Sequence, residues 1–494
     1  MPLDQSQTPL LDRLYHCANR DNAAFYTPGH KRGQGISERH RQTFGDRIFR
    51  ADLPELPELD NLFAPTDVIL QAQALAAEAF GAEHTRFLAN GSTCGIQAAI
   101  LATCGPGDKL IVPRNAHSSV ISGLILSGAT PVYVQPSYSA GWDMPLGVEP
   151  ASIAAALSAH ADVKAVLVVS PTYQGICSKL EEIARLVHAH NIPLIVDEAH
   201  GPHFAFHRDL PTAAMAAGAD IAVQSAHKVL SAFTQAAMLH VRGDRINQNR
   251  LSRCLQITQS TSPSYLLLGS LDAARHQMAT EGEALMTRAI ELADFACTEL
   301  QALAPGLEVM QPQNGDRTRI TVDVSKLGLS GFEADDILHE QFSVTAELPA
   351  LRTLTFIVSL GNTATDIQQL ISGFRSLCRL PRSSRLPRSI KSASTNNLRG
   401  NLTTNSRLFQ PPLPTIIHTP RQIFYASTQT ISTTDAVGRI CAETICPYPP
   451  GIPTLLPGEA ITQTAIAYLQ DLINRGVTLT GCKDKTLQTI VVTA

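Results

Sequence analysis

One lysine in the sequence stands where its amine could act as a nucleophile. Lys228 ends the segment Gln224-Ser225-Ala226-His227-Lys228, which directly follows the apolar run 221–223. At the end of a buried run and beside a histidine, a lysine is partly desolvated, and desolvation together with a nearby cation lowers the pKa of its amine. A deprotonated lysine can attack an aldehyde. A single lysine is more often a solvated surface residue, so this interpretation needs support from other segments.

A second candidate is a carboxylate at the end of another apolar run. Asp197 follows 194–196 and begins the segment Asp197-Glu198-Ala199-His200-Gly201. A buried carboxylate needs a cationic partner to offset its desolvation, and a protonated pyridine nitrogen is such a partner. The letters Asp-Glu-Ala-His also spell a helicase box. We reject that interpretation because the sequence has no Gly-Lys pair and therefore no phosphate-binding loop for ATP.

A third segment suits a phosphate group. Asn90-Gly91-Ser92-Thr93-Cys94-Gly95 precedes the helix-like stretch 96–103. Backbone N–H groups, hydroxyl groups and the helix dipole would meet at such a helix start. Alone, the pattern is more typical of an ordinary helix N-cap. Together, the three segments supply contacts for the phosphate, the ring nitrogen and the aldehyde of a single cofactor.

The elements that must position these residues follow an α/β pattern. Apolar runs rich in β-branched residues alternate with amphipathic stretches such as 180–190, which predicts parallel strands joined by helices in an open sheet. Ligands of such sheets bind at the carboxyl ends of the strands. The predicted strands are Lys109–Val112, Pro131–Val134, Lys164–Val169, Pro193–Val196 and Ile221–Val223.

The rest of the chain predicts further domains. A long helix is expected over 281–303, and strands at 319–324 and 353–360 with a helix at 331–342 indicate a smaller α/β domain. Residues 379–407 hold seven Lys or Arg and no acidic residue, which favours a solvated linker over a nucleic-acid-binding tail. The expected divisions are an N-terminal segment (1–65), a large cofactor-binding domain (66–300), a small domain (301–378), a basic linker (379–410) and a C-terminal domain (411–494).

Composition narrows the class of protein. The 494 residues are 44% hydrophobic and 17% charged with a net charge of −4, which fits a soluble multidomain protein without a field that attracts nucleic acid or anionic membranes. The start of the sequence lacks the pattern of a secretory signal, and no apolar run reaches the ~18 residues of a membrane helix. The ten cysteines are scattered, as in reduced proteins. We therefore expect a cytoplasmic protein.

Taken with further motifs, these segments resemble those of fold-type I enzymes that use pyridoxal 5′-phosphate (PLP). More narrowly, the chain resembles the bacterial ornithine/lysine/arginine decarboxylase family, in a short form without the N-terminal wing domain of its large members. The resemblance covers most of the chain. The other motifs that carry it are Thr27-Pro28-Gly29-His30-Lys31, Leu56-Pro57-Glu58-Leu59-Asp60-Asn61-Leu62, Arg114-Asn115-Ala116-His117, Ser170-Pro171-Thr172-Tyr173-Gln174-Gly175, Gln259-Ser260-Thr261-Ser262-Pro263-Ser264-Tyr265, Tyr448-Pro449-Pro450-Gly451-Ile452-Pro453 and Pro457-Gly458-Glu459.

The resemblance implies PLP as cofactor, no metal, and a role for each matching residue. Lys228 would hold PLP as a Schiff base, and Asp197 would pair with the pyridinium nitrogen. His117 would stack on one face of the ring and Ala199 would pack on the other, with His200 nearby. The residues expected to bind the phosphate or lie beside it are Ser92, Thr93, Ser225 and His227. Thr261 and Ser262 would reach the phosphate of a partner subunit, so the active site would be shared in a homodimer, possibly within a dimer of dimers.

The implied reaction is decarboxylation of a basic L-amino acid to the corresponding amine. Arginine is favoured, and lysine and ornithine remain open. A cationic side chain needs an acidic counterpart, for which Asp60, Glu443 and Glu459 are the candidates. The chain departs from the family pattern at Ser118, where a basic residue is usual, and in the basic stretch 379–407, which matches nothing in the family.

Two other functions remain open at this point. An aminotransferase would normally hold the substrate carboxylate with an arginine of the small domain, and Arg352 is available. A catalytically inactive regulatory or binding protein could share the fold, although the Asp197 and Lys228 pair argues against it. Release of carbon dioxide would distinguish a decarboxylase from both.

Overall fold

The computed structural model describes residues 2–303, 305–311, 314–380, 413–448, 453–474 and 477–494. The chain forms two compact units, which we describe separately. The first unit consists of Met1–Cys104, Lys164–Ser170 and Leu180–Thr287. The second consists of Gly105–Val163, Pro171–Lys179 and Arg288–Ala494. Most of the predicted basic linker lies outside the described residues.

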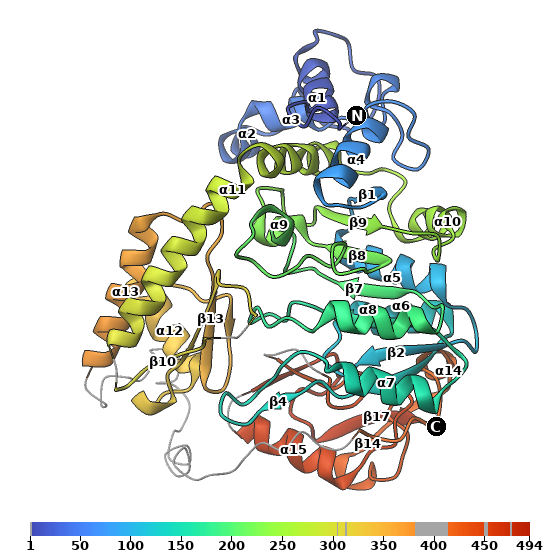
Figure 1. Cartoon of the computed structure of the whole chain (residues 1–494), viewed down its shortest axis with the longest axis vertical. Helices are drawn as coiled ribbons and strands as arrows, with labels where there is room; N and C mark the ends of the chain where they lie inside the picture. Colours follow the sequence, from blue (N-terminus) through green and yellow to red (C-terminus); the bar gives the residue numbers. More distant parts are fainter. Residues whose placement is uncertain (1, 304, 312–313, 381–412, 449–452, 475–476) are drawn as a thin grey trace. The chain divides into compact units, whose positions relative to one another are not determined.

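The first unit is built on a mostly parallel sheet, as the sequence predicts. Its strands lie in the order β1 (His84–Leu88), β9 (Ala237–Val241), β8 (Ile221–Gln224), β7 (Leu194–Asp197) and β6 (Val163–Val169). Figure 1 shows β1, β9, β8 and β7 side by side. Strands β6, β7 and β8 run parallel, whereas β9 is antiparallel to both its neighbours. Every residue of β7, β8 and β9 is buried, which fits a sheet covered on both faces.

Helices cover this sheet and bring the candidate phosphate segment to it. Helix α5 (Gly91–Thr103) packs against β1, β8, β9 and α10 (Gln248–Thr258). Gly95 makes this approach possible, because a Cβ atom there would lie 2.7 Å from both Leu88 Cδ1 and Val223 Cγ1. Helix α8 (Leu180–Ala189) packs on β7. Short helix α9 (Ala226–Val229) follows β8 and contains Lys228.

The N-terminal part of the first unit is helical. Helix α4 (Val68–Ala79) packs against β1 and α1 (Pro9–Asn19). The remaining short elements are α2 (Glu38–Phe44), α3 (Asp46–Ala51), η1 (Pro57–Leu59) and η2 (Phe204–Phe206). The expected long helix is α11 (Tyr265–Ala302), which begins well before the predicted position 281.

The second unit contains a parallel pair of strands and a small antiparallel sheet. The pair is β2 (Lys109–Pro113) and β3 (Thr130–Val134), with α7 (Pro150–Ala159) on β3 and α6 (Ser118–Ser127) against α14 (Pro420–Tyr425). A hairpin of β4 (Tyr138–Ser139) and β5 (Met144–Pro145) follows β3. The small sheet has the order β10 (Glu308–Val309), β11 (Arg319–Asp323), β13 (Thr353–Ile357) and β12 (Leu348–Pro349).

The small sheet carries its own helices. Helix α12 (Gly331–Phe342) occupies the predicted residues, packs on β13 and contacts α13 (Ala364–Arg379). Gly331 begins α12 because a Cβ atom there would lie 2.3 Å from the carbonyl oxygen of Thr353. A short turn, η3 (Ser325–Leu327), follows β11.

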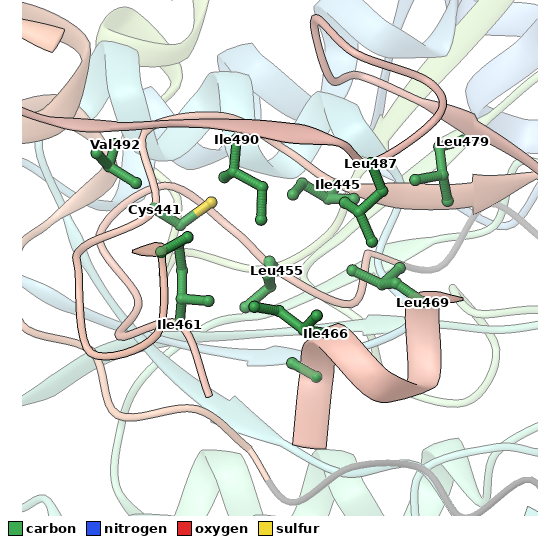
Figure 2. Close-up of a cluster of buried hydrophobic side chains, with 12 residues drawn as sticks. Cys441, Ile445, Leu455, Ile461, Ile466, Leu469, Leu479, Leu487, Ile490 and Val492 are labelled. Carbon is green, nitrogen blue, oxygen red and sulfur yellow. The ribbon is translucent and has the colours of Figure 1, made fainter. Parts of the chain in front are cut away.

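The C-terminal residues form a separate apolar core within the second unit. Two strand pairs surround it: β14 (Thr428–Ser432) with β17 (Thr489–Thr493), and β15 (Cys446–Tyr448) with β16 (Thr478–Thr480). Helix α15 (Gln463–Asn474) and turn η6 (Thr433–Asp435) complete the group. Figure 2 shows the buried side chains, which are Ala436, Cys441, Ile445, Leu455, Ile461, Ala465, Ile466, Leu469, Leu479, Leu487, Ile490 and Val492. No helix in the described ranges is both long enough and apolar enough to span a membrane.

Candidate active site

The candidate nucleophile and the candidate ring-binding carboxylate follow neighbouring strands. Asp197 is the last residue of β7, and Lys228 lies in α9, which follows β8. Because β7 and β8 are parallel, their carboxyl ends lie at the same edge of the sheet. Asp197 is 5% exposed, and its Oδ1 accepts a hydrogen bond from the Ala199 backbone N–H at 3.2 Å. This hydrogen bond fixes Ala199, itself buried, beside the carboxylate.

The Lys228 amine contacts a buried histidine. Its Nζ lies 2.9 Å from Nε2 of His200, a residue that is 4% exposed. In this pair one nitrogen donates the proton and the other accepts it, so a proton can move between them. The backbone N–H of Lys228 donates to the Ser225 carbonyl, which closes the turn that presents the side chain. The structure therefore joins Lys228 and His200, two residues that the sequence suggested separately.

The predicted phosphate segment forms the start of α5. Ser225 Oγ donates to Ser92 Oγ at 2.8 Å, so the hydroxyl groups of two distant segments meet there. The Asn90 side chain does not cap α5; its Oδ1 instead accepts from the Ser260 backbone N–H at 3.2 Å. Thr93, in the first turn, is exposed. Hydroxyl groups beside the N-terminus of a 13-residue helix suit a phosphate.

The other cofactor candidates of this unit lie on nearby turns. The backbone N–H and the ring Nδ1 of His227 both lie within hydrogen-bonding distance of the Ala236 carbonyl, with the ring contact at 3.1 Å, which orients the imidazole. Thr261 and Ser262 are both exposed. Their loop is held by the Ser262 N–H, which donates to Ser260 Oγ at 3.1 Å.

A buried polar network behind these residues was missed by the sequence reasoning. Glu198 accepts hydrogen bonds from the Ala214 N–H at 2.7 Å and from Gln224 Nε2 at 2.8 Å. Gln224 Oε1 lies 3.0 Å from His240 Nε2, and His240 Nδ1 lies 2.8 Å from Thr85 Oγ1. The network links the ends or interiors of β7, β8, β9 and β1. The sequence does contain a signal of this network, because the polar residues Gln224 and His240 stand in otherwise apolar runs.

Burial sets the protonation of this network. It raises the pKa of Glu198 to about 8 and lowers the pKa of His240 to about 3. At neutral pH the histidine is neutral and the carboxyl is largely protonated, so the network crosslinks the strands without buried net charge.

His117 belongs to the second unit. It is the N-cap of α6, its Nδ1 accepts from the Ser119 N–H at 3.2 Å, and it is exposed. Ser118, the departure from the family pattern, is the first residue of the same helix and is also exposed.

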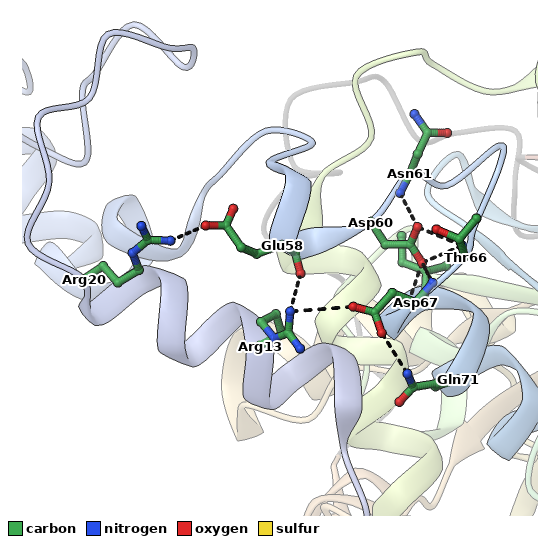
Figure 3. A network of polar contacts seen from close by, with 9 residues as sticks. Arg13, Arg20, Glu58, Asp60, Asn61, Thr66, Asp67 and Gln71 are labelled. Atoms are coloured by element: carbon green, nitrogen blue, oxygen red, sulfur yellow. Dashed lines mark hydrogen bonds and ion pairs between the residues drawn. The ribbon is translucent and has the colours of Figure 1, made fainter.

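The three candidate substrate carboxylates all have structural partners. Figure 3 shows Asp60, whose carboxylate accepts backbone N–H hydrogen bonds at the start of α4. The donors are Asn61, Thr66, Asp67 and Ile69, at 2.8–3.2 Å. Burial opposes ionisation of Asp60, but these hydrogen bonds prevail and lower its pKa. Asp60 thus has a complete structural role as a helix-start acceptor.

The two C-terminal candidates are held in the second unit. Glu459, 1% exposed, forms a two-pronged ion pair with the buried Arg114, with one N–O distance of 2.8 Å. Glu443 accepts from the Lys483 N–H at 2.7 Å and from the Val491 N–H at 2.8 Å. Arg352, the candidate carboxylate ligand of an aminotransferase, donates to Asp323 at 2.8 Å. Each of these side chains already serves the fold.

The residues of the first unit fit PLP. They supply an amine, a buried carboxylate at the end of the adjacent strand, and paired hydroxyl groups at a helix N-terminus, which match the aldehyde, the ring nitrogen and the phosphate.

Comparison with known proteins decides the family. The model of the Orn/Lys/Arg decarboxylase major domain matches residues 8–319, and that of the C-terminal domain matches residues 403–486. The chain belongs to the Orn/Lys/Arg decarboxylase family. It is 38% identical to an arginine decarboxylase of Bacillus anthracis over 99% of this chain and 97% of that protein. It is 37% identical to an arginine decarboxylase of Bacillus subtilis over 99% of this chain and 98% of that protein.

A solved structure supports the fold. The lysine decarboxylase LdcF of Francisella novicida matches 99% of this chain and 81% of its own, with a TM-score of 0.86 and 23% identity. The predicted fold class is therefore confirmed. With the family established, the chain is a PLP-dependent decarboxylase of a basic amino acid. Decarboxylation thus prevails over the aminotransferase and inactive-protein alternatives.

Proposed function

We propose that this decarboxylase acts on arginine and releases the corresponding amine, agmatine, and carbon dioxide. The observation that carries the proposal is the 37–38% identity to two Bacillus arginine decarboxylases across nearly their whole length. The identity to the lysine decarboxylase of Francisella novicida is lower, at 23%.

The proposal assigns the cofactor contacts to residues of the first unit and to His117. Lys228 would hold the cofactor, and Asp197 would keep the ring nitrogen protonated. The phosphate would be bound by Ser92, Thr93 and Ser225, with His227 beside them. His117 and Ala199 would pack on the two ring faces. When bound, PLP supplies an electron sink for the electrons left on Cα as carbon dioxide departs.

The protein's own contribution is placement of charge and of one mobile proton. Because Lys228 and His200 share a hydrogen bond, a proton delivered from Lys228 to Cα could be replaced through His200. His227 is the other candidate donor, with its ring oriented by the Ala236 carbonyl. The buried Asp197 would favour a positive charge on the ring nitrogen beside it.

We also propose a homodimer in which Thr261 and Ser262 approach the phosphate of a partner subunit. Their exposure in a loop held by Ser260 supports this proposal. The test mixes Lys228→Ala chains with Thr261→Ala chains. Sedimentation would show whether mixed dimers form. A shared site predicts that activity is partly recovered in those mixed dimers.

The main test compares carbon dioxide release from arginine, lysine and ornithine. We expect arginine to give the highest kcat/KM. Lys228→Ala should lose both turnover and the visible absorbance of the bound cofactor, whereas Lys164→Ala, at an exposed position of β6, should retain both. Retention of activity by Lys228→Ala would overturn the assignment of the lysine, and a higher kcat/KM for lysine or ornithine would overturn the assignment of the substrate.

A further inference from the structure

Two glutamine side chains hold the backbone of Ala89, the residue that leads from strand β1 toward the start of α5. Ala89 is 4% exposed and lies one residue beyond Leu88, where the pairing of β1 with β9 ends. Its N–H donates to Gln259 Oε1 at 2.9 Å, and its carbonyl accepts from Gln235 Nε2 at 2.9 Å. Buried backbone groups need partners, so these two amides take over where the hydrogen bonds of the sheet stop.

The turn that follows Ala89 is the proposed phosphate site. Asn90 is the N-cap of α5, but its side chain accepts from the Ser260 N–H instead of capping the helix. The first N–H groups of a helix have no partner within the helix, so a diverted N-cap side chain leaves them to a ligand. The direction of these N–H groups depends on how the backbone enters the helix, and therefore on Ala89.

The backbone of Gln235 adopts an uncommon conformation at this contact. Its φ is 83°, a positive value that few residues other than glycine, asparagine and aspartate adopt. Its carbonyl oxygen lies 3.8 Å from the position that a Cβ atom of Gly91 would occupy. Residues in such conformations concentrate at binding and active sites, where the surrounding contacts hold them. Both the side chain and the backbone of Gln235 thus lie beside the start of α5.

The same loop is also tied to the helix that carries Lys228. Ala236, the residue after Gln235, accepts from the backbone N–H of His227, and the His227 ring lies 3.1 Å from the same carbonyl. His227 directly precedes Lys228 in α9. Residues 235 and 236 therefore contact the phosphate turn and the lysine-bearing helix in succession. Since these two elements would bind opposite ends of one cofactor, their separation must match its length.

We propose that Gln235 and Gln259 are positioning residues for the cofactor phosphate. By holding both backbone groups of Ala89, they keep the first turn of α5 in the placement that binds the phosphate. This inference rests on the proposed assignment of Ser92 and Thr93 to that group. When either contact is lost, the turn occupies the binding placement for only a fraction of the time, and the affinity falls by that fraction.

A comparison of PLP with pyridoxal, which lacks the phosphate, isolates this effect. Equilibrium dialysis of the full-length protein, first freed of cofactor, gives the Kd of each compound. Gln259→Met and Gln235→Met keep an unbranched side chain of similar length but remove the amide. Each should raise the Kd of PLP at least about fivefold, the effect of one buried backbone group left without a partner. The Kd of pyridoxal should stay unchanged, because other segments hold the ring and the aldehyde.

A control and a second variant keep the test independent of folding. Gln256→Met, at an exposed position of α10, is the matched control and should change neither Kd. Gln259 is buried, whereas Gln235 is exposed. Gln235→Met therefore tests the proposal even if Gln259→Met does not fold. Circular dichroism would establish the fold of each variant.

Ser92→Ala separates the positioning role from the phosphate assignment on which it rests. If Ser92→Ala lowers the preference for PLP over pyridoxal and the folded glutamine variants do not, the positioning role is overturned and the assignment of Ser92 is kept. If only the glutamine variants lower the preference, the positioning role is supported and Ser92 loses its assignment. If none of them lowers it, both are overturned. A glutamine variant that weakens PLP and pyridoxal equally would also overturn the positioning role, because the loss would not involve the phosphate.

Discussion

Replacing Glu198 tests whether the buried network behind the site is protonated as its burial implies. Glu198 is 1% exposed and accepts hydrogen bonds from the Ala214 N–H and from Gln224 Nε2. In Glu198→Gln the carboxyl becomes an amide of nearly the same shape that cannot ionise. The Gln224 amide can turn to accept from the new amide, and His240 can change tautomer to match, because its neutral ring has one donor and one acceptor.

The pH dependence of stability gives the magnitude. Burial raises the pKa of Glu198 from 4.5 to about 8, despite hydrogen bonds that lower it. Between these values the unfolded chain has lost the proton and the folded chain retains it, so the free energy of unfolding of the native protein falls as pH rises. At roughly 1.4 kcal/mol per pKa unit, the loss between pH 5 and pH 8 is about 3 kcal/mol. Glu198→Gln lacks this loss. Its free energy of unfolding relative to that of the native protein should therefore rise by the same amount between pH 5 and pH 8.

The assay is urea unfolding, followed by circular dichroism at pH 5 and pH 8. Glu182→Gln, at an exposed position of α8, is the matched control and should follow the native protein at both pH values. Glu198→Ala should be destabilised at both, because it leaves two buried donors unpaired at a cost of roughly 1–3 kcal/mol each. The reasoning is refuted if the difference between Glu198→Gln and the native protein is the same at pH 5 and pH 8.

Three further predictions concern residues that hold the fold together. Glu459→Gln breaks a buried ion pair and leaves Arg114 uncompensated, so thermal unfolding should show a loss of roughly 3–5 kcal/mol; an unchanged Tm would contradict the pairing. Gly95→Ala forces a methyl group between α5 and the sheet, so the free energy of unfolding should fall by roughly 1–3 kcal/mol and PLP retention on dialysis should weaken. Gly141→Ala, with open space around its Cβ position, is the control and should change neither. Asp60→Asn should destabilise the protein by about 1 kcal/mol or more and leave KM for arginine unchanged; a large rise in KM would instead identify Asp60 as a substrate ligand.

The sheet could be predicted where its strands are apolar throughout. The runs at 164–169, 193–196 and 221–223 became β6, β7 and β8, because fully buried parallel strands consist of nearly continuous apolar residues. Strand β9 was missed because His240 interrupts its apolar run. That histidine is tolerated there because its two ring nitrogens contact Gln224 and Thr85, which come from other strands.

The residues of the candidate site likewise divide into those whose roles were predicted from the sequence and those whose roles were not. The placing of Ser92 and Ser225 at one phosphate was predicted from the family resemblance, and their hydroxyl groups are hydrogen-bonded in the structure. The roles of Asp60 and Glu459 were not, because a carboxylate that binds a substrate and one that accepts backbone or arginine donors look alike in a sequence. The donors that decide between these two roles lie far away in the sequence. Arg114, for example, is more than three hundred residues from Glu459.

The adjacent acids Asp197 and Glu198 explain why the end of β7 carries two carboxyl groups in succession. The Glu198 N–H still pairs with the Val223 carbonyl, so the extended backbone continues and the two side chains point to opposite faces of the sheet. Glu198 enters the buried network, where its raised pKa keeps it neutral at moderate pH and lets it crosslink β7 to β8. Asp197 is left on the other face, where the proposed pairing with a ring nitrogen needs a charged carboxylate. A second ionised carboxyl one residue away would disfavour ionisation of Asp197, because like charges raise each other's pKa, so neutrality of Glu198 serves the site as well as the fold. The same reasoning predicts that Glu198→Gln preserves PLP affinity while Glu198→Ala, which frees Gln224 beside Ser225, weakens it, a difference that dialysis followed by absorbance would measure.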